Sequence, residues 1–240
     1  MRIPSLAMSS LAMSSLAMSL ASIAVLGLSS AGAATAQSGC DVLGGTVMAG
    51  NDCQVKSTTV NYHMDIRFPV NYPDEGAVVA YLTQNRDGFV NVAQTPDSRN
   101  LPYEMDVTSE SFSSGVPPAG TQSVVLKLFQ DVGGAHPVTW YKAFTYNLSR
   151  RQPITFDSLF PLGSVPLASI YPIVARELER QTGLTGAVSP SEGLDPSHYQ
   201  DFAITDDSVI FFFGQGVLLP SDAGATSAVV PRNAIPPLQI

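Results

Sequence analysis

Residues 60–68 read VNYHMDIRF, a stretch in which apolar and polar side chains alternate without interruption. The apolar positions are Val60, Tyr62, Met64, Ile66 and Phe68, and the polar positions are Asn61, His63, Asp65 and Arg67. Successive side chains of a strand point to opposite faces of its sheet, so this period of two predicts a half-buried β-strand. His63 falls on the polar face, where we expect it to be solvated.

Further strands and a first helix are predicted after this stretch. From Pro73 the apolar spacing becomes helical behind an acidic first turn, which predicts a helix. Residues 103–112, 121–132 and 139–148 again have the pattern of strands.

A second helix is predicted over residues 166–182, whose apolar side chains form one stripe. Gly183 follows directly and serves as a stop signal. Pro172 lies inside the segment, so we expect the first turn or two to bend, or the helix to begin late.

Residues 201–220, DFAITDDSVIFFFGQGVLLP, contain two short apolar runs about Asp206 and Asp207, which predicts a hairpin. The run 209–213 is apolar throughout instead of alternating, so we expect a central strand that is covered on both faces. Strands interrupted by two main helices and joined by hairpins predict an α+β fold around a mostly antiparallel sheet.

Residues 1–36 have the pattern of a signal peptide. Arg2 supplies a positive start, residues 23–28 form an apolar run, and Ala34-Thr35-Ala36 places small residues before a cleavage site. We therefore predict a signal peptide over residues 1–36 and a single secreted α+β domain over residues 37–240.

Two alternatives to simple cleavage stay open. A retained membrane anchor is less favoured, because serines interrupt the apolar run. Acylation of Cys40 is the other alternative, since Ser38 and Gly39 precede it, but Gln37 stands where such a signal prefers leucine.

The composition and the motifs exclude several classes of function. The chain has 12 basic and 20 acidic residues and no cluster of Lys or Arg, so we expect no nucleic-acid partner. No later stretch is long and apolar enough to span a bilayer, so no membrane span is expected after cleavage. Nucleotide-binding and zinc-hydrolase signatures are absent from the sequence, which predicts no cofactor and no metal.

The two cysteines, Cys40 and Cys53, lie near the start of the predicted mature chain. An exported chain with an even number of cysteines favours a disulfide between them. A metal or redox pair is less favoured, because the spacing is not C-x-x-C and no histidine is adjacent.

His136 lies in the loop sequence Gly-Gly-Ala-His-Pro, and two interpretations of it stay open. As a general base, it requires an acid such as Asp131 or Asp195 and a serine nucleophile. The serines considered for that role are Ser111, Ser113 and Ser114, and the candidate catalytic set is His136, Asp131 and Ser114. As a structural residue, its ring binds the backbone and pins a loop that the glycines and Pro137 turn. The second interpretation is favoured, because no nucleophile motif such as G-x-S-x-G is present.

Four segments together resemble a known family. They are NYPDEGAVVAYLTQNRDGF (71–89), PPAGTQSVVLKLFQDVGGAHPVTWYKAFTYNL (117–148), QPITFDSLF (152–160) and GLDPSHYQDFAITDDSVIFFFGQGVLLP (193–220). In this order they are similar to the secreted mycobacterial immunogenic protein family, which shares its C-terminal domain with lysozyme-sensing anti-sigma factors. The segment VGGAHPVTW (132–140) and the proline-rich C-terminal end resemble the sequence of a paralogue of the major secreted antigen of that family more than the antigen itself.

The resemblance carries expectations about fold and function. It implies an α+β fold with a β-grasp-like element, and a protein that is secreted or associated with the cell wall. It implies action by interaction with host or cell-envelope molecules, the partner being a protein or a glycan. Because some relatives are named esterases, the alternative is a serine-type carboxylesterase that acts on short acyl esters.

Overall fold

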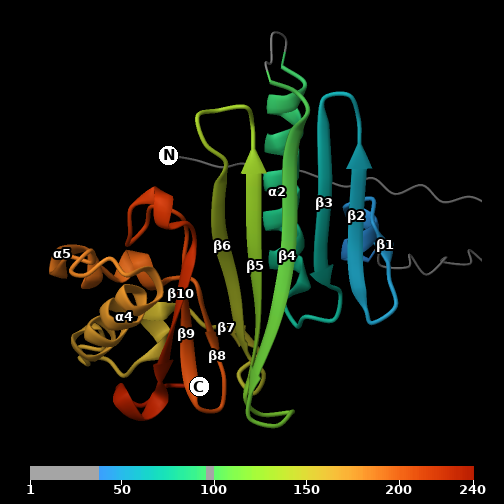
Figure 1. Cartoon of the computed structure of the whole chain (residues 1–240). Coiled ribbons are helices and arrows are strands. Elements are labelled where there is room, and N and C mark those ends of the chain that lie inside the picture. The colour runs from blue at the N-terminus through green and yellow to red at the C-terminus, as the bar shows by residue number, and fades with distance from the viewer. Residues whose placement is uncertain (1–37, 96–99) are drawn as a thin grey trace, which may run out of the picture. The chain divides into compact units, whose positions relative to one another are not determined.

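The computed structural model describes residues 38–95 and 100–240 (Figure 1). The predicted signal peptide lies outside the described residues, so its cleavage stays a prediction. The described part contains a seven-stranded sheet, a three-stranded sheet and two long helices. The α+β class with a mostly antiparallel sheet is therefore confirmed.

The elements in chain order are α1 (Gly39–Val42), β1 (Thr46–Val47), β2 (Asp52–Thr58), β3 (Tyr62–Pro69), α2 (Glu75–Ala93), β4 (Tyr103–Ser114), β5 (Thr121–Asp131), β6 (Val138–Asn147), β7 (Gln152–Pro153), α3 (Phe156–Leu159), α4 (Leu167–Thr182), α5 (Pro190–Gly193), η1 (Pro196–Tyr199), β8 (Phe202–Ile204), β9 (Ser208–Phe213), η2 (Ser221–Ala223), β10 (Thr226–Pro231) and η3 (Arg232–Ala234). The strands predicted at 60–68, 103–112, 121–132 and 139–148 correspond to β3, β4, β5 and β6.

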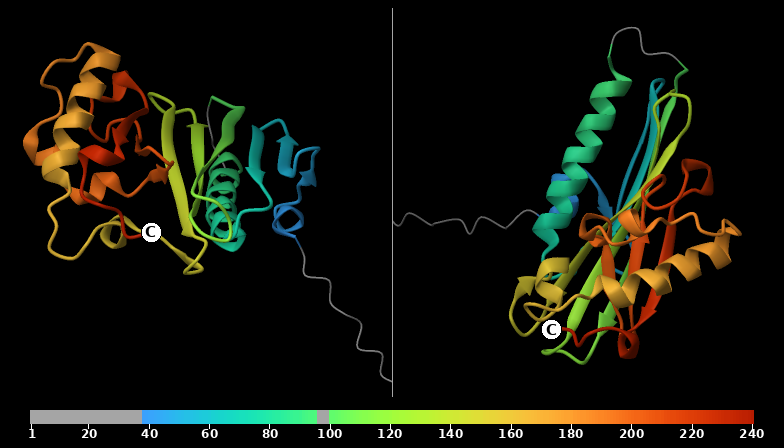
Figure 2. Two further views of the ribbon diagram at one scale, coloured as in Figure 1. Left: turned by 90° about the horizontal axis from the view of Figure 1, so that it is seen from below. Right: turned by 90° about the vertical axis from the view of Figure 1, so that its left-hand side faces the viewer.

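The large sheet has the order β1-β2-β3-β4-β5-β6-β7. Its β3–β4 pair is parallel, because α2 connects the two strands and returns the chain to the same end of the sheet. The other described pairs of this sheet are antiparallel. α2 runs along one face of this sheet (Figure 2). The alternation is confirmed from Tyr62 onward, since Tyr62, Met64, Ile66 and Phe68 are buried and His63 is exposed. Val60, which was expected on the same apolar face, precedes the strand and is 89% exposed.

The small sheet has the order β10-β9-β8 and is antiparallel. Val209, Phe211 and Phe213 of β9 face a core that includes α4. Ile210 and Phe212, on the other side of the strand, pack with residues of the large sheet such as Val125 and Ala143. The hairpin at 201–220 and the central strand covered on both faces are therefore confirmed.

The predicted second helix is α4, which ends at Gly183 in the left-handed conformation with φ of 73°. Pro172 lies within the helix, yet the helix begins at Leu167, so the expected late start is wrong. Leu167 and Ile170 are buried in the core around β9. This burial holds the first turns in place, because packing of an apolar face contributes more to a helix than one lost backbone hydrogen bond.

No helix in residues 38–95 and 100–240 is long and apolar enough to cross a bilayer. This agrees with the sequence after residue 36, which has no run of the required length.

Cys40 and Cys53 form the predicted disulfide, which joins α1 to β2. Both residues are fully buried in the core beneath α2. The sulfur of Cys40 is bonded in this structure, which leaves no thiol there for acylation.

Replacing both Cys40 and Cys53 with serine is expected to lower the free energy of unfolding by about 3 kcal/mol, because the cross-link restricts the unfolded chain. Urea unfolding of the variant and of the oxidised parent measures the difference. Thiol titration of the denatured, unreduced parent must find no free thiol. Two reactive thiols, or equal stability of the two proteins, would contradict the expectation.

Candidate functional site

His136 lies in the loop between β5 and β6, and its side chain is exposed. Gly133 turns the loop with φ of 69°. The Gly133 N–H donates to Asp131 Oδ1 at 2.9 Å, and Asn100 Nδ2 donates to the Gly133 carbonyl at 3.2 Å. Asp131 thus stabilises the turn. His136 makes no hydrogen bond within the described ranges, so its ring does not pin the loop.

The segment after β9 forms a wall beside this loop. Gln215 N–H donates to the Thr139 carbonyl at 2.9 Å, and the Thr139 N–H donates to Gln215 Oε1 at 3.1 Å. This reciprocal pair fixes residues 214–216 against the start of β6.

A cavity of about 550 Å³ lies between the loop and this wall. We call it the His136 cavity; its lining residues are His136, Pro137, Thr139, Gln215, Ser221, Asp222 and Gly224. The volume lies within the usual range for small-molecule sites of about 300–1,000 Å³. It is large enough for a small acyl ester.

Ser221 and Asp222 come from η2 and are exposed. Ser221 Oγ lies against Gly216, where an added Cβ would stand 2.9 Å from that oxygen. Gly216 also has φ of 80°, so a side chain at that position is disfavoured on both counts. The glycine therefore leaves space for the Ser221 hydroxyl beside the cavity.

The His136 cavity brings together the three residue types that nucleophilic acyl transfer uses: a serine, a histidine and a carboxylate. No hydrogen bond joins Ser221, His136 and Asp222 in the described part of the chain. Catalytic hydrogen bonds are often formed only in the substrate complex.

The candidate catalytic residues predicted from the sequence, His136, Asp131 and Ser114, do not lie together in the structure. Ser114 lies opposite Thr121, at one end of β5, whereas Asp131 ends the same strand. Nine to ten residues of strand separate them, which is roughly 30 Å. Ser114 is buried and accepts a hydrogen bond from Arg232 Nη1 at 3.1 Å. Catalytic roles for His136, Asp131 and Ser114 individually stay predictions, but the three do not form one site.

Asp195 also lies apart from the His136 cavity, because its carboxylate accepts from the Ser197 N–H at 2.8 Å and caps η1. Ser221 and Asp222 were not selected from the sequence. Their proximity to His136 depends on long-range packing and is not readable from local patterns.

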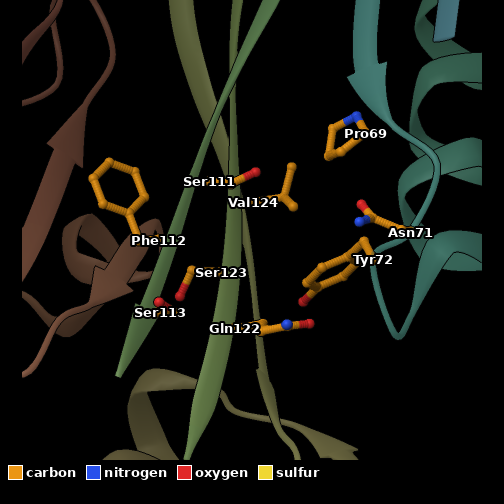
Figure 3. Close-up of a pocket in the computed structure, with 9 residues that line it drawn as sticks. All are labelled: Pro69, Asn71, Tyr72, Ser111, Phe112, Ser113, Gln122, Ser123 and Val124. Carbon is orange, nitrogen blue, oxygen red and sulfur yellow. The ribbon is translucent and has the colours of Figure 1, made fainter. Parts of the chain in front are cut away.

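A second cavity, of about 260 Å³, opens between β3 and β4. We call it the β3–β4 cleft; it is lined by Pro69, Asn71, Tyr72, Ser111, Phe112, Ser113, Gln122, Ser123 and Val124 (Figure 3). Burial, together with the nearby Asp74 carboxylate, raises the pKa of the Tyr72 hydroxyl above its ordinary value. The hydroxyl therefore stays a neutral hydrogen-bond donor. The lining contains no histidine or carboxylate, so general acid–base catalysis has no residue in this cleft.

Comparison with known proteins gives one match to the C-terminal part of the chain and several matches to most of its length. The family described as "Protein of unknown function (DUF3298)" matches residues 157–233, which include the small sheet and η2. A DUF3298 family protein from Pseudomonas aeruginosa has a similar fold, with a TM-score of 0.51 at 11% identity over 78% of this chain and 94% of that chain.

Two groups of curated relatives match most of the chain. Esterase Rv3036c of Mycobacterium tuberculosis is 64% identical over 205 residues, which are 85% of this chain and 90% of the relative. Immunogenic proteins MPT64 of M. tuberculosis and MPB64 of M. bovis are 45% identical over 196 residues, which are 82% of this chain and 86% of each relative. The identities of 64% and 45% agree with the resemblance to a paralogue of the antigen. The chain belongs to the MPT64/MPB64-like immunogenic protein family.

Proposed function

We propose that this protein is a serine-type esterase that hydrolyses short acyl esters in the His136 cavity. The observation that carries the proposal is the presence of Ser221, His136 and Asp222 in the lining of one cavity. The 64% identity to a relative named an esterase supports it independently.

In the proposed reaction, Ser221 Oγ attacks the carbonyl carbon of the ester while His136 accepts the serine proton. The C–O bond to the alcohol then breaks, and the alcohol leaves with that proton. Water, activated by His136, hydrolyses the acyl-serine and restores the hydroxyl. Asp222 orients the imidazole and stabilises its charged form, as the acid does in other hydrolases with this residue set.

The proposal is tested with the purified chain from Gln37 to Ile240 and p-nitrophenyl acetate. Turnover is expected, and a serine-directed phosphonate is expected to abolish it and to add its mass to the peptide that contains Ser221. Turnover that survives complete labelling, or a label confined to another serine, would overturn the assignment. A chain without turnover would overturn the proposal itself.

We further propose that the protein works outside the cytoplasm, either secreted or associated with the cell wall. The buried Cys40–Cys53 disulfide supports this location, because such bonds persist in oxidising compartments. An N-terminus at Gln37 in protein from culture filtrate, read by mass spectrometry, is the expected result; a chain that keeps residues 1–36 in the cell would contradict it.

A second candidate function is interaction with a host or cell-envelope protein or glycan. The β3–β4 cleft favours it, because this cleft has polar lining residues but no acid–base pair. The identity of 45% to proteins named immunogenic agrees with it as well.

A further inference from the structure

The β3–β4 cleft opens where two paired strands separate. β3 and β4 pair from Tyr62 opposite Tyr103 to Ile66 opposite Val107. β3 then ends at Pro69, while β4 continues to Ser114. Within the described residues, no strand pairs with residues 108–114 on this side, although β5 pairs with them on the other. Backbone N–H and C=O groups of β4 therefore face the cleft without a strand partner.

The side chains of β4 change character at the same point. On the side that faces α2, Tyr103, Met105 and Val107 are large and buried. The next residues on that side are serines at positions 109, 111 and 113. Serine is small, so it leaves the edge of β4 accessible from the cleft. Figure 3 shows Ser111 and Ser113 on one side of the gap and Pro69, Asn71 and Tyr72 on the other.

Most polar side chains of the cleft lack protein partners in the described residues; the exception is Ser123, whose hydroxyl accepts from Thr145 Oγ1 and the Ile204 N–H. The side chains of Asn71, Ser111, Ser113 and Gln122 make no hydrogen bond to another protein group in residues 38–95 and 100–240. The hydroxyl of Tyr72, a residue that is only 6% exposed, likewise makes none within these ranges. Tyr72 is too buried to offer the open aromatic face on which a sugar ring stacks. These groups instead flank the unpaired backbone.

The open edge has little of the usual protection, because its one charged residue, Glu110, lies on the face opposite the serines that line the cleft. Exposed edges are commonly blocked by lysine, proline or inward-pointing charges. Residues 108–114, TSESFSS, contain neither lysine nor proline, and the cleft lining contains no charged residue. The cleft has a volume of about 260 Å³, which admits a few side chains of one extended chain and not the folded sheet of a second copy.

We propose that the β3–β4 cleft binds an extended polypeptide segment, which pairs with residues 108–114 of β4 as an added strand. Backbone hydrogen bonds to β4 supply the affinity, and alternate side chains of the ligand enter the cleft. Those side chains are uncharged, since a charge there loses its hydration and gains no ionic partner. The site is separate from ester hydrolysis, because Gln122 and the His136 loop lie at opposite ends of β5.

In the test, the chain from Gln37 to Ile240 is used to select binders from a library of heptapeptides. The peptides contain only uncharged residues, and their ends are acetylated and amidated. The selected peptide is expected to slow amide hydrogen exchange in residues 108–114. In the cleft-filling variant Ser111→Leu/Ser113→Leu its affinity is expected to fall at least tenfold. Thr108→Leu, an exposed change on the opposite face of the same strand, serves as the matched control and is expected to bind normally.

Three outcomes would overturn the proposal. The first is a library with no peptide whose binding depends on the cleft. The second is peptide binding without slowed exchange in residues 108–114. The third is cleft-dependent binding of maltoheptaose, or of a second copy of the chain in sedimentation, in place of peptide. If Ser111→Leu/Ser113→Leu does not fold, the proposal is decided by whether the selected peptide slows amide hydrogen exchange in residues 108–114 of the parent chain.

Discussion

Ser221→Ala is expected to lower kcat/KM for p-nitrophenyl acetate by a factor of about 10³ or more, because the proposed reaction loses its nucleophile. His136→Ala is expected to lower kcat/KM by a factor of about 10² to 10⁴, which is the usual contribution of a general base. Both side chains are exposed, so neither change removes buried packing. We therefore expect the Tm of each variant to stay close to that of the parent protein.

Matched controls separate this site from the residues that the sequence suggested first. His63→Ala removes an exposed histidine of β3, and Ser114→Ala removes the buried serine bonded to Arg232. Turnover by both controls is expected to remain within about threefold of the parent, measured well below the Tm. If Ser221→Ala keeps full activity while Ser114→Ala loses it, the His136 cavity is not the catalytic site.

Phe211→Ala is expected to lower the free energy of unfolding by about 3–5 kcal/mol, as removal of a buried aromatic ring does. Phe211 is fully buried. Its ring centroid lies 5.2 Å from the ring centroid of Tyr199 and 6.1 Å from the ring centroids of Phe156 and Phe202. The neighbouring rings come from separate elements, so the core cannot close over the cavity without moving several of them. Urea unfolding measures the loss.

The control for this change is Val229→Ala on the adjacent strand β10, where the side chain is 51% exposed. Its effect is expected to stay within about 0.5 kcal/mol, the usual range for surface substitutions. A loss below about 1.5 kcal/mol for Phe211→Ala would show that this core repacks freely, against the expectation.

The elements with strong local patterns were predictable from the sequence. The alternation in β3, the apolar run of β9 and the stop at Gly183 each correspond to an observed feature. The parallel pairing of β3 with β4 was not predicted, because it depends on the path of α2 between them. β2 and β10 were also not identified in advance; β2 alternates only over part of its length, and β10 has two exposed positions.

The candidate site was predictable only in part. The loop sequence drew attention to His136, which does line a cavity. Asp131, which was considered with Asp195 as the acid partner of His136, accepts a hydrogen bond from the Gly133 N–H and stabilises the turn. Ser221 and Asp222 reach the cavity because the reciprocal Thr139–Gln215 pair holds the segment after β9 against β6. Such a contact between distant segments has no local sequence signature.

The two-sided burial of β9 has a consequence for limited proteolysis. Ile210 and Phe212 shield Val125 and Ala143 of the large sheet, while Phe211 and Phe213 belong to the core around α4. A cut after Arg180, a trypsin site whose side chain is 70% exposed, releases the C-terminal segment from residue 181 onward and therefore removes the cover from apolar surface on the remaining fragment. That fragment is expected to aggregate instead of persisting as a stable remnant, so trypsin digestion should pass from intact chain to small peptides without a long-lived intermediate.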